Sequence, residues 1–267
     1  MLKFDDYQFN YSLTGRRNNQ PLLFLHGFMG SSNDFNNAIA LLADQFYCLT
    51  IDLPGHGKTK VFGGDHCYTM PNTAQAAIAL LDRLNIIEKC FLVGYSMGGR
   101  LALYLTLHFP DRFAKVVLES AAPGLKTVAE KLSRIQRDSQ LAKELETGDF
   151  NAFLLKWYNQ PIFNSLKKHP RFQELLEIRL DNTPLELAKS LRRMGTGSQP
   201  YLQHKLEHNQ IPLLLLVGEY DDKFRTINEE MLNACQVANM KVIKNCGHNI
   251  HFEDINLWIS HLKEFCN

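Results

Sequence analysis

An excess of charge of one sign, long apolar runs and paired cysteines are all missing from this chain of 267 residues. Lysine and arginine total 29 and aspartate and glutamate total 28, so the formal net charge is +1. This balance gives no bulk electrostatic reason to expect nucleic acid or a membrane surface as a partner. No apolar run approaches the roughly 20 residues of a membrane-spanning helix. The apolar stretch 211–217 is instead typical of a buried strand.

Only six cysteines are present, and none of them belongs to a C-x-x-C pair. They stand at positions 48, 67, 90, 235, 246 and 266. No metal site is expected, because zinc sites in proteins usually combine ligands at characteristic short spacings. Cys90 falls within a predicted strand, which favours the role of a small buried hydrophobe. Residues 1–7 lack an apolar core of signal-peptide length, so we expect a soluble protein in the reducing cytoplasm.

Among the motifs that are present, G-x-S-x-G at Gly94, Ser96 and Gly98 is the most informative. The short apolar segment 89–93 before it predicts a strand, and the segment 100–108 after it predicts a helix. A serine in such a sharp turn has a strained backbone, which holds its Oγ clear of the sheet at a helix N-terminus. The bare pattern is common, but the flanking strand and helix make it typical of the nucleophile elbow of α/β-hydrolases.

Strands and helices alternate in the first and last parts of the chain but not in its middle. The alternating parts predict a mostly parallel sheet with helices on both faces. Residues 7–13 alternate between apolar and polar, which predicts a half-exposed antiparallel edge strand. Residues 126–206 show helical periodicity, many charges and no strand candidate. We therefore predict an α/β-hydrolase fold whose core, 1–125 and 207–267, is interrupted by a helical lid, 126–206.

A serine nucleophile or base needs a histidine and an orienting acid, which follow it in the chain in this fold. A predicted strand at 240–243 leads to His248, which has the required position and order. The preceding strand leads to Asp221 and Asp222, and position alone does not separate these two acids. Glu119, at the end of the strand after the elbow, is a less favoured alternative.

The backbone donors of an oxyanion hole are expected at two places in this fold. One is the residue after the elbow serine, and the other lies in the loop after an early core strand. These rules assign the N–H groups of Met97 and Phe28 to the oxyanion hole. His26, in the same loop as Phe28, is expected to orient the loop rather than to transfer protons.

Several motifs resemble those of the 2-succinyl-6-hydroxy-2,4-cyclohexadiene-1-carboxylate synthases of the menaquinone pathway. The elbow itself is shared by many hydrolases, so the lid motifs carry the specific part of the resemblance. They are W-Y-x-Q-P-x-F at 157–163 and G-T-G-x-Q-P at 195–200. The later core is similar through G-E-x-D-x-K-F at 218–224 and G-H-N at 247–249. The resemblance implies that Asp221 is the acid of the triad.

The resemblance also implies a lyase that eliminates pyruvate from a cyclohexene bearing a succinyl group. Its substrate is a small polycarboxylate, with menaquinone or phylloquinone as the end product of the pathway, and it implies no metal or organic cofactor. A polycarboxylate needs fixed cations, and arginine suits a bidentate contact. Arg100 lies one helical turn after Ser96, and the arginines of the family's lid match Arg134 and Arg179. For any one lid arginine, a solvated surface position is the alternative.

Two aromatic residues are candidates for the wall of the substrate site. Trp157 in the lid could cover the ring of the substrate, and Tyr95 beside Ser96 could line the pocket. Packing within the protein is the alternative for both. The same triad also fits an ester or carbon–carbon bond hydrolase that forms an acyl-serine, although the lid motifs argue against it. Whether Ser96 acts as base or nucleophile stays open, and the oligomeric state is not indicated.

Overall fold

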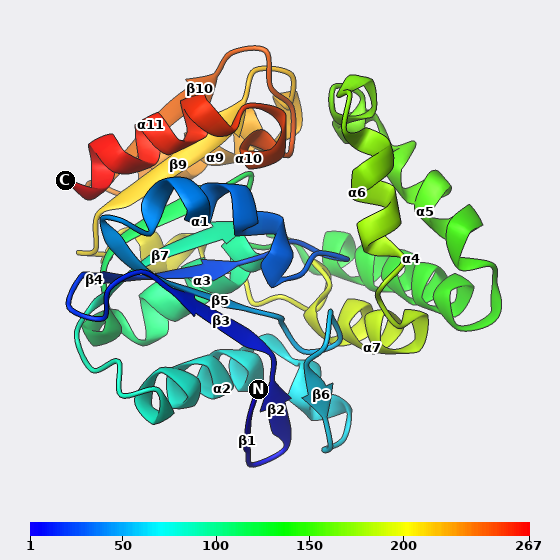
Figure 1. Cartoon of the computed structure of the whole chain (residues 1–267). Coiled ribbons are helices and arrows are strands. Elements are labelled where there is room, and N and C mark those ends of the chain that lie inside the picture. Colours follow the sequence, from blue (N-terminus) through cyan, green and yellow to red (C-terminus); the bar gives the residue numbers. More distant parts are fainter.

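A seven-stranded sheet forms the centre of the computed structural model, which describes residues 1–267 (Figure 1). From edge to edge it contains β10 (Ala238–Ile243), β9 (Leu213–Gly218), β8 (Phe113–Glu119), β7 (Cys90–Tyr95), β4 (Gln20–Leu25), β5 (Phe46–Ile51) and β3 (Tyr11–Thr14). Every neighbouring pair is parallel except β3 and β5, which are antiparallel. The predicted mostly parallel sheet is therefore confirmed.

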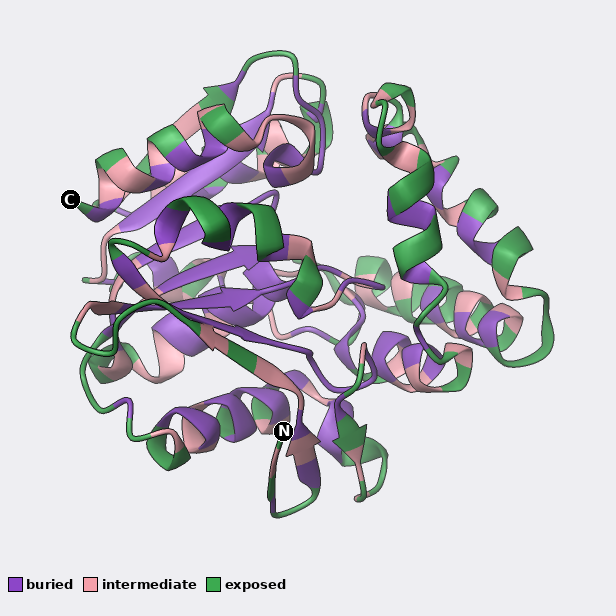
Figure 2. Cartoon of the chain, viewed as in Figure 1, coloured by how far each residue is buried: buried purple, intermediate pink, exposed green.

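Helices cover both faces of this sheet, because alternate residues of its strands supply two separate apolar cores. Leu214 and Leu216 of β9 belong to the core under α1 (Asn36–Leu42) and α11 (Ile255–Cys266). Leu213 and Leu215 belong to the opposite core. That second core is covered by α2 (Met70–Arg83), α3 (Met97–His108) and α9 (Asp222–Ala234). Figure 2 shows the resulting continuous burial of the central strands.

Between β8 and β9 the chain contains only helices and turns, and residues 126–206 are called the helical lid below. Its elements are α4 (Val128–Thr147), α5 (Phe150–Tyr158), the turns η4 (Pro161–Phe163) and η5 (Leu166–Lys168), α6 (Phe172–Arg179), α7 (Pro184–Met194) and α8 (Gln203–Leu206). Thr127 and Glu130 form a capping box at the start of α4, which satisfies two backbone N–H groups there. A third hydrophobic cluster of thirteen buried residues lies in the lid, and it includes one residue of the core, Met29.

The N-terminal segment differs from the single edge strand predicted over 7–13. The structure divides it at Asn10 into β2 (Tyr7–Phe9) and β3. The Asn10 N–H donates to Thr59 Oγ1, and its side-chain amide donates to Asp52, so the strand leaves the main sheet there. A separate small sheet contains β1 (Leu2–Phe4), β2 and β6 (Lys60–Val61). The remaining short helices are η1 (Ser32–Phe35), η2 (Asp65–Tyr68), η3 (Pro110–Arg112) and α10 (Ile250–Glu253). No helix combines the length and the hydropathy of a membrane span.

One buried ion pair joins the lid to the core. Arg179 of α6 contacts Asp34 of η1 through two hydrogen bonds, of 2.6 and 2.9 Å. The two side chains are 5% and 6% exposed, and Arg179 Nε also donates to the hydroxyl of Tyr158. Burial by itself raises the pKa of Asp34, but the charge and hydrogen bonds of Arg179 outweigh it and lower that pKa below its ordinary value. The pair therefore stays charged near neutral pH.

Asp34→Asn should lower the free energy of unfolding by about 3–5 kcal/mol, because it leaves the Arg179 charge buried and unpaired. Urea unfolding followed by tryptophan fluorescence measures this loss. The pKa of Asp34 is lowered in the folded state, so wild-type stability should fall as the pH drops through that value. Asp34→Asn should flatten this dependence.

The matched control is the exposed pair of Arg171 and Glu174 at the start of the same helix. Glu174→Gln should leave the unfolding curve unchanged, because water solvates both groups. Equal losses from Asp34→Asn and Glu174→Gln would show that the buried pair does not hold the lid to the core.

Candidate active site

Ser96 occupies a strained turn between β7 and α3. Its backbone angles are φ 50° and ψ −107°, in a region that residues other than glycine rarely adopt. At two positions of this turn the neighbouring backbone lies too close for a side chain. A Cβ on Gly98 would lie 2.1 Å from the carbonyl oxygen of Leu25, and a Cβ on Gly94 would lie 2.5 Å from that of Gly98. Only glycine fits at both positions, and the result is the elbow that the sequence predicts.

Ser96, His248 and Asp221 form a continuous hydrogen-bonded chain. His248 Nε2 lies 3.1 Å from Ser96 Oγ, and His248 Nδ1 lies 2.6 Å from Asp221 Oδ2. Asp221 follows β9 and His248 follows β10, and their side chains are 1% and 3% exposed. Since Nδ1–H donates to the carboxylate, Nε2 is free to accept the hydroxyl proton of Ser96. The geometry is that of a serine–histidine–acid triad.

The two alternative acids lie elsewhere. The Asp222 side chain is 91% exposed and lies 3.4 Å from Arg225, so water and that arginine solvate it. Glu119 is buried, and its carboxylate accepts hydrogen bonds from the backbone N–H groups of Ile250 and His251. It also accepts from His251 Nδ1 and from Trp258 Nε1. Its carboxylate therefore fixes the segment after His248 instead of contacting His248 itself.

The loop after β4 lies against the elbow, since a Cβ on Gly27 would lie 3.6 Å from Ser96 Cβ. Phe28 N–H donates to no group within the protein, and Met97 is the first residue of α3, where an N–H has no acceptor in a preceding turn. Both residues line the cavity that Ser96 faces. His26 Nδ1 donates to Gly27 O and its Nε2 accepts from Leu53 N–H. Burial lowers the pKa of His26, so its neutral ring orients the loop as expected.

A cavity of about 360 Å³ lies between Ser96 and the helical lid. Its apolar wall includes Trp157, Ile162 and Phe163, and Trp157 also packs on the rings of Phe28 and Phe153. Four cationic side chains reach it, and no carboxylate side chain does; the cations are Arg100, Arg134, Arg137 and Lys223. A partly apolar site with several cations and no acid suits a ligand that carries more than one negative charge.

Arg100 has no carboxylate hydrogen-bonded to it, although it is buried. The residue is 8% exposed, and its Nη1 donates to Met194 O and Gln199 Oε1, which are both neutral acceptors. Burial, and next the charge of Arg134, lower the pKa of Arg100 to about 10. Arg134 itself is paired with Asp138, at 2.7 Å. Arg100 is therefore a buried cation that an anionic ligand could neutralise.

Two of the residues expected in the substrate site lie outside this cavity. Arg179 is bound to Asp34, which neutralises its charge and turns it toward the core. The ring of Tyr95 is buried between His248 and His251, with centroid distances of 5.6 and 4.9 Å. For Tyr95 the structure matches the packing alternative. The expected Arg100, Arg134 and Trp157 do line the cavity.

Two cavity cations were not expected in the substrate site, although signals for both were present. Lys223 was not among the candidate residues, and Arg137, a lid arginine without a match in the family, was expected to be solvated. Lys223 lies within the motif at 218–224, two residues after Asp221, and the start of α9 turns it toward the cavity. Arg137 follows Arg134 by three residues on α4, a spacing that places both side chains on one helix face. Burial, and next the charge of Arg134, lower the pKa of Lys223 below its ordinary value.

Comparison with known proteins identifies the family. A family model described as the alpha/beta hydrolase fold matches residues 20–255. A putative 2-succinyl-6-hydroxy-2,4-cyclohexadiene-1-carboxylate synthase of Bacillus subtilis (strain 168) is 35% identical over 254 residues, 94% of this chain and 92% of that protein. The synthase of the same name from Escherichia coli O1:K1 / APEC is 33% identical over 233 residues, 87% of this chain and 88% of that protein.

A solved structure, that of MenH from S. aureus, superposes on this chain with a TM-score of 0.90 at 34% sequence identity. The match covers 96% of this chain and 97% of that one. Fold, sequence and near-complete coverage agree, and they confirm the resemblance carried by the lid motifs. The chain belongs to the family of 2-succinyl-6-hydroxy-2,4-cyclohexadiene-1-carboxylate synthases, enzymes built on the α/β-hydrolase fold.

Proposed function

We propose that this enzyme eliminates pyruvate from 2-succinyl-5-enolpyruvyl-6-hydroxy-3-cyclohexene-1-carboxylate. The product is the cyclohexadiene for which its relatives are named. The observation that carries the proposal is the cavity beside Ser96, which has four cations and no acid. The substrate carries one carboxylate each on its ring, succinyl and enolpyruvyl groups. A simple ester would have no use for so many cations, because each costs desolvation when it is left unpaired.

In this proposal Ser96 is the base of the elimination. Asp221 orients His248, and His248 accepts the hydroxyl proton of Ser96. The serine oxygen then removes a proton from the carbon beside the succinyl ketone, and the electron pair forms an enolate. As the enolate electrons return through the ring, the bond between the ring and the enolpyruvyl oxygen breaks. The leaving group takes up the proton from His248 and becomes pyruvate.

The remaining residues of the site stabilise charge. The N–H groups of Phe28 and Met97 donate to the enolate oxygen, and loss of one such donor typically costs on the order of 10²–10³ in rate. Arg100 and Arg134 hold carboxylates, with Lys223 as a further candidate, and Trp157 covers the apolar part of the ring.

The reactant is a small polycarboxylate, and the proposed location is the cytoplasm. The six unpaired cysteines of the chain support a reducing compartment.

Ser96→Ala, His248→Ala and Asp221→Asn should each lower kcat for pyruvate release by about 10³-fold or more. The three groups act as one unit, so Ser96→Ala combined with His248→Ala should lose little beyond either single variant. Pyruvate is measured by coupling its release to lactate dehydrogenase and following NADH.

Asp222→Asn is the matched control, because it removes the same charge one residue away from an exposed side chain. It should retain nearly wild-type kcat. A near-normal kcat in Ser96→Ala, or a loss in Asp222→Asn as large as that in Asp221→Asn, would contradict the assigned triad.

Arg100→Met should raise KM or lower kcat so that kcat/KM for the polycarboxylate falls by about 30-fold or more. The reason is that removing one partner of a buried charge pair typically costs roughly 2–5 kcal/mol, or one factor of ten for each 1.4 kcal/mol. Arg171→Met, at an exposed pair on the lid, is the control and should leave kcat/KM unchanged. Equal effects of the two variants would remove the carboxylate-binding role of Arg100.

The competing function, hydrolysis through an acyl-serine, predicts a different intermediate. A hydrolase would accumulate enzyme whose mass is increased by an acyl group on Ser96. Elimination forms no bond between Ser96 and the substrate. Rapid acid quench during turnover, followed by mass spectrometry of the intact chain, should therefore find only unmodified enzyme. An acyl adduct that appears on the wild-type enzyme but not on Ser96→Ala would favour the hydrolase.

A further inference from the structure

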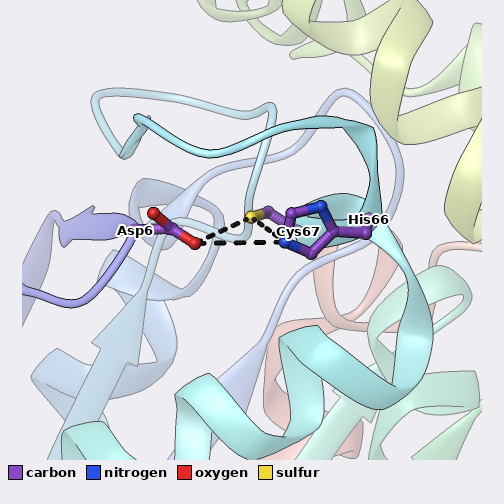
Figure 3. A group of neighbouring side chains, drawn as sticks. All are labelled: Asp6, His66 and Cys67. Atoms are coloured by element: carbon purple, nitrogen blue, oxygen red, sulfur yellow. Dashed lines mark hydrogen bonds and ion pairs between the residues drawn. The ribbon is translucent and has the colours of Figure 1, made fainter.

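Three potential metal ligands meet at the N-terminal edge of the molecule, outside the cavity of the triad. They are Asp6, in the turn between β1 and β2, and His66 and Cys67, in η2 (Figure 3). Cys67 Sγ lies 3.5 Å from His66 Nε2 and 3.7 Å from Asp6 Oδ2. His66 Nε2 and Asp6 Oδ2 are 4.0 Å apart. This is the one group of three such ligand atoms in the chain.

The arrangement is that of a chelate and differs from a catalytic relay. In the triad, the two nitrogens of His248 contact two different partners. At the second cluster a single nitrogen, His66 Nε2, is nearest to both the thiol and the carboxylate. Three atoms that surround one point suit a metal ion. Tetrahedral zinc, with bonds of about 2.0–2.3 Å, would separate such ligands by about 3.4–3.6 Å.

The point between the three ligand atoms is open to solvent from one side. Cys67 is 1% exposed and forms the floor, whereas the side chains of His66 and Asp6 are 67% and 52% exposed and can adjust. Together they line a surface depression of about 370 Å³. The hydroxyl of Tyr7 donates to Cys67 O and fixes the backbone there. A Cβ on Gly63 would lie 2.5 Å from Cys67 Sγ, so a side chain at this position would crowd the thiol.

We propose that Asp6, His66 and Cys67 bind a zinc ion whose fourth position is open to water. The mixed sulfur, nitrogen and oxygen ligands fit zinc, which is borderline in softness and has no geometric demand of its own. On binding, the Cys67 thiolate replaces the thiol, and the proton goes to solvent. The proposal departs from the expectation of no metal site, which rested on short ligand spacings, because Asp6 stands 61 residues from Cys67.

A metal here would join the β1–β2 hairpin to η2, and η2 also contacts the helical lid. Asp65 of η2 pairs with Arg193 of α7 at 2.9 Å, and the Tyr68 hydroxyl donates to Glu186 of the same helix. The bound ion would therefore constrain a segment on which the lid rests. Since zinc would bind the folded chain preferentially, it should raise Tm, and the stabilisation should grow with the logarithm of the free zinc concentration above Kd.

The test is titration of the full-length, untagged chain with Co²⁺, a spectroscopic substitute for zinc. Wild type should take up one equivalent, with the intense visible bands of a tetrahedral site and a thiolate-to-cobalt charge-transfer band in the near ultraviolet. Zinc should abolish both bands and raise Tm. Cys67→Ser should lose the charge-transfer band, and His66→Ala should weaken binding by about 100-fold or more, since even outer-shell changes typically cost 10–100-fold.

Asp5→Asn is the matched control, because it removes a carboxylate from the same turn but not from the cluster, and asparagine tolerates the positive φ of Asp5. It should bind cobalt as wild type does. The proposal is overturned if wild type shows no charge-transfer band, or if the band persists in Cys67→Ser. The readouts are spectra and Tm, so they do not depend on pyruvate release.

Discussion

The strained backbone of Ser96 is the constraint on which the rest of the site depends. In this turn the start of α3 lies so close to β4 that no side chain fits at position 98 beside Leu25 O. The turn is therefore possible only because residue 98 is glycine. The same close approach brings the start of α3 beside the loop that leaves β4. Met97 and Phe28 therefore line the same cavity as Ser96. One tight contact thus brings the elbow and the two proposed donors of the oxyanion hole to the same cavity.

A second buried group, Glu119, performs the corresponding task for His248. Its carbonyl accepts from Ser96 N–H, while its carboxylate accepts from the backbone of Ile250, from His251 and from Trp258. A buried carboxylate is costly unless several donors surround it, and here the donors come from the start of α10 and from α11. The residue that ends β8 therefore fixes both the elbow and the segment that carries the histidine.

The features that the sequence predicts are those with a local signal. The elbow and the strand ends before Asp221 and His248 each appear as a pattern within a short window, the lack of strand candidates predicts the helical lid, and the family follows from motifs of three to seven residues. Position could not separate Asp221 from Asp222, because their burial depends on where α9 begins. The pairing of Arg179 with Asp34 spans 145 residues and leaves no local pattern. Its match to an arginine of the family's lid had made Arg179 a candidate substrate ligand.

The cavity shows how charge can couple the lid to the core. Arg134 and Arg137 come from α4 of the lid, whereas Arg100 and Lys223 come from helices of the core. Like charges repel across this boundary: after burial, the charge of Arg134 is the next cause that lowers the pKa of Arg100 and of Lys223. A polycarboxylate bound between the two pairs would replace this repulsion with attraction on both sides. The substrate would then supply the electrostatic contact that closes its own site, and a neutral ester could not.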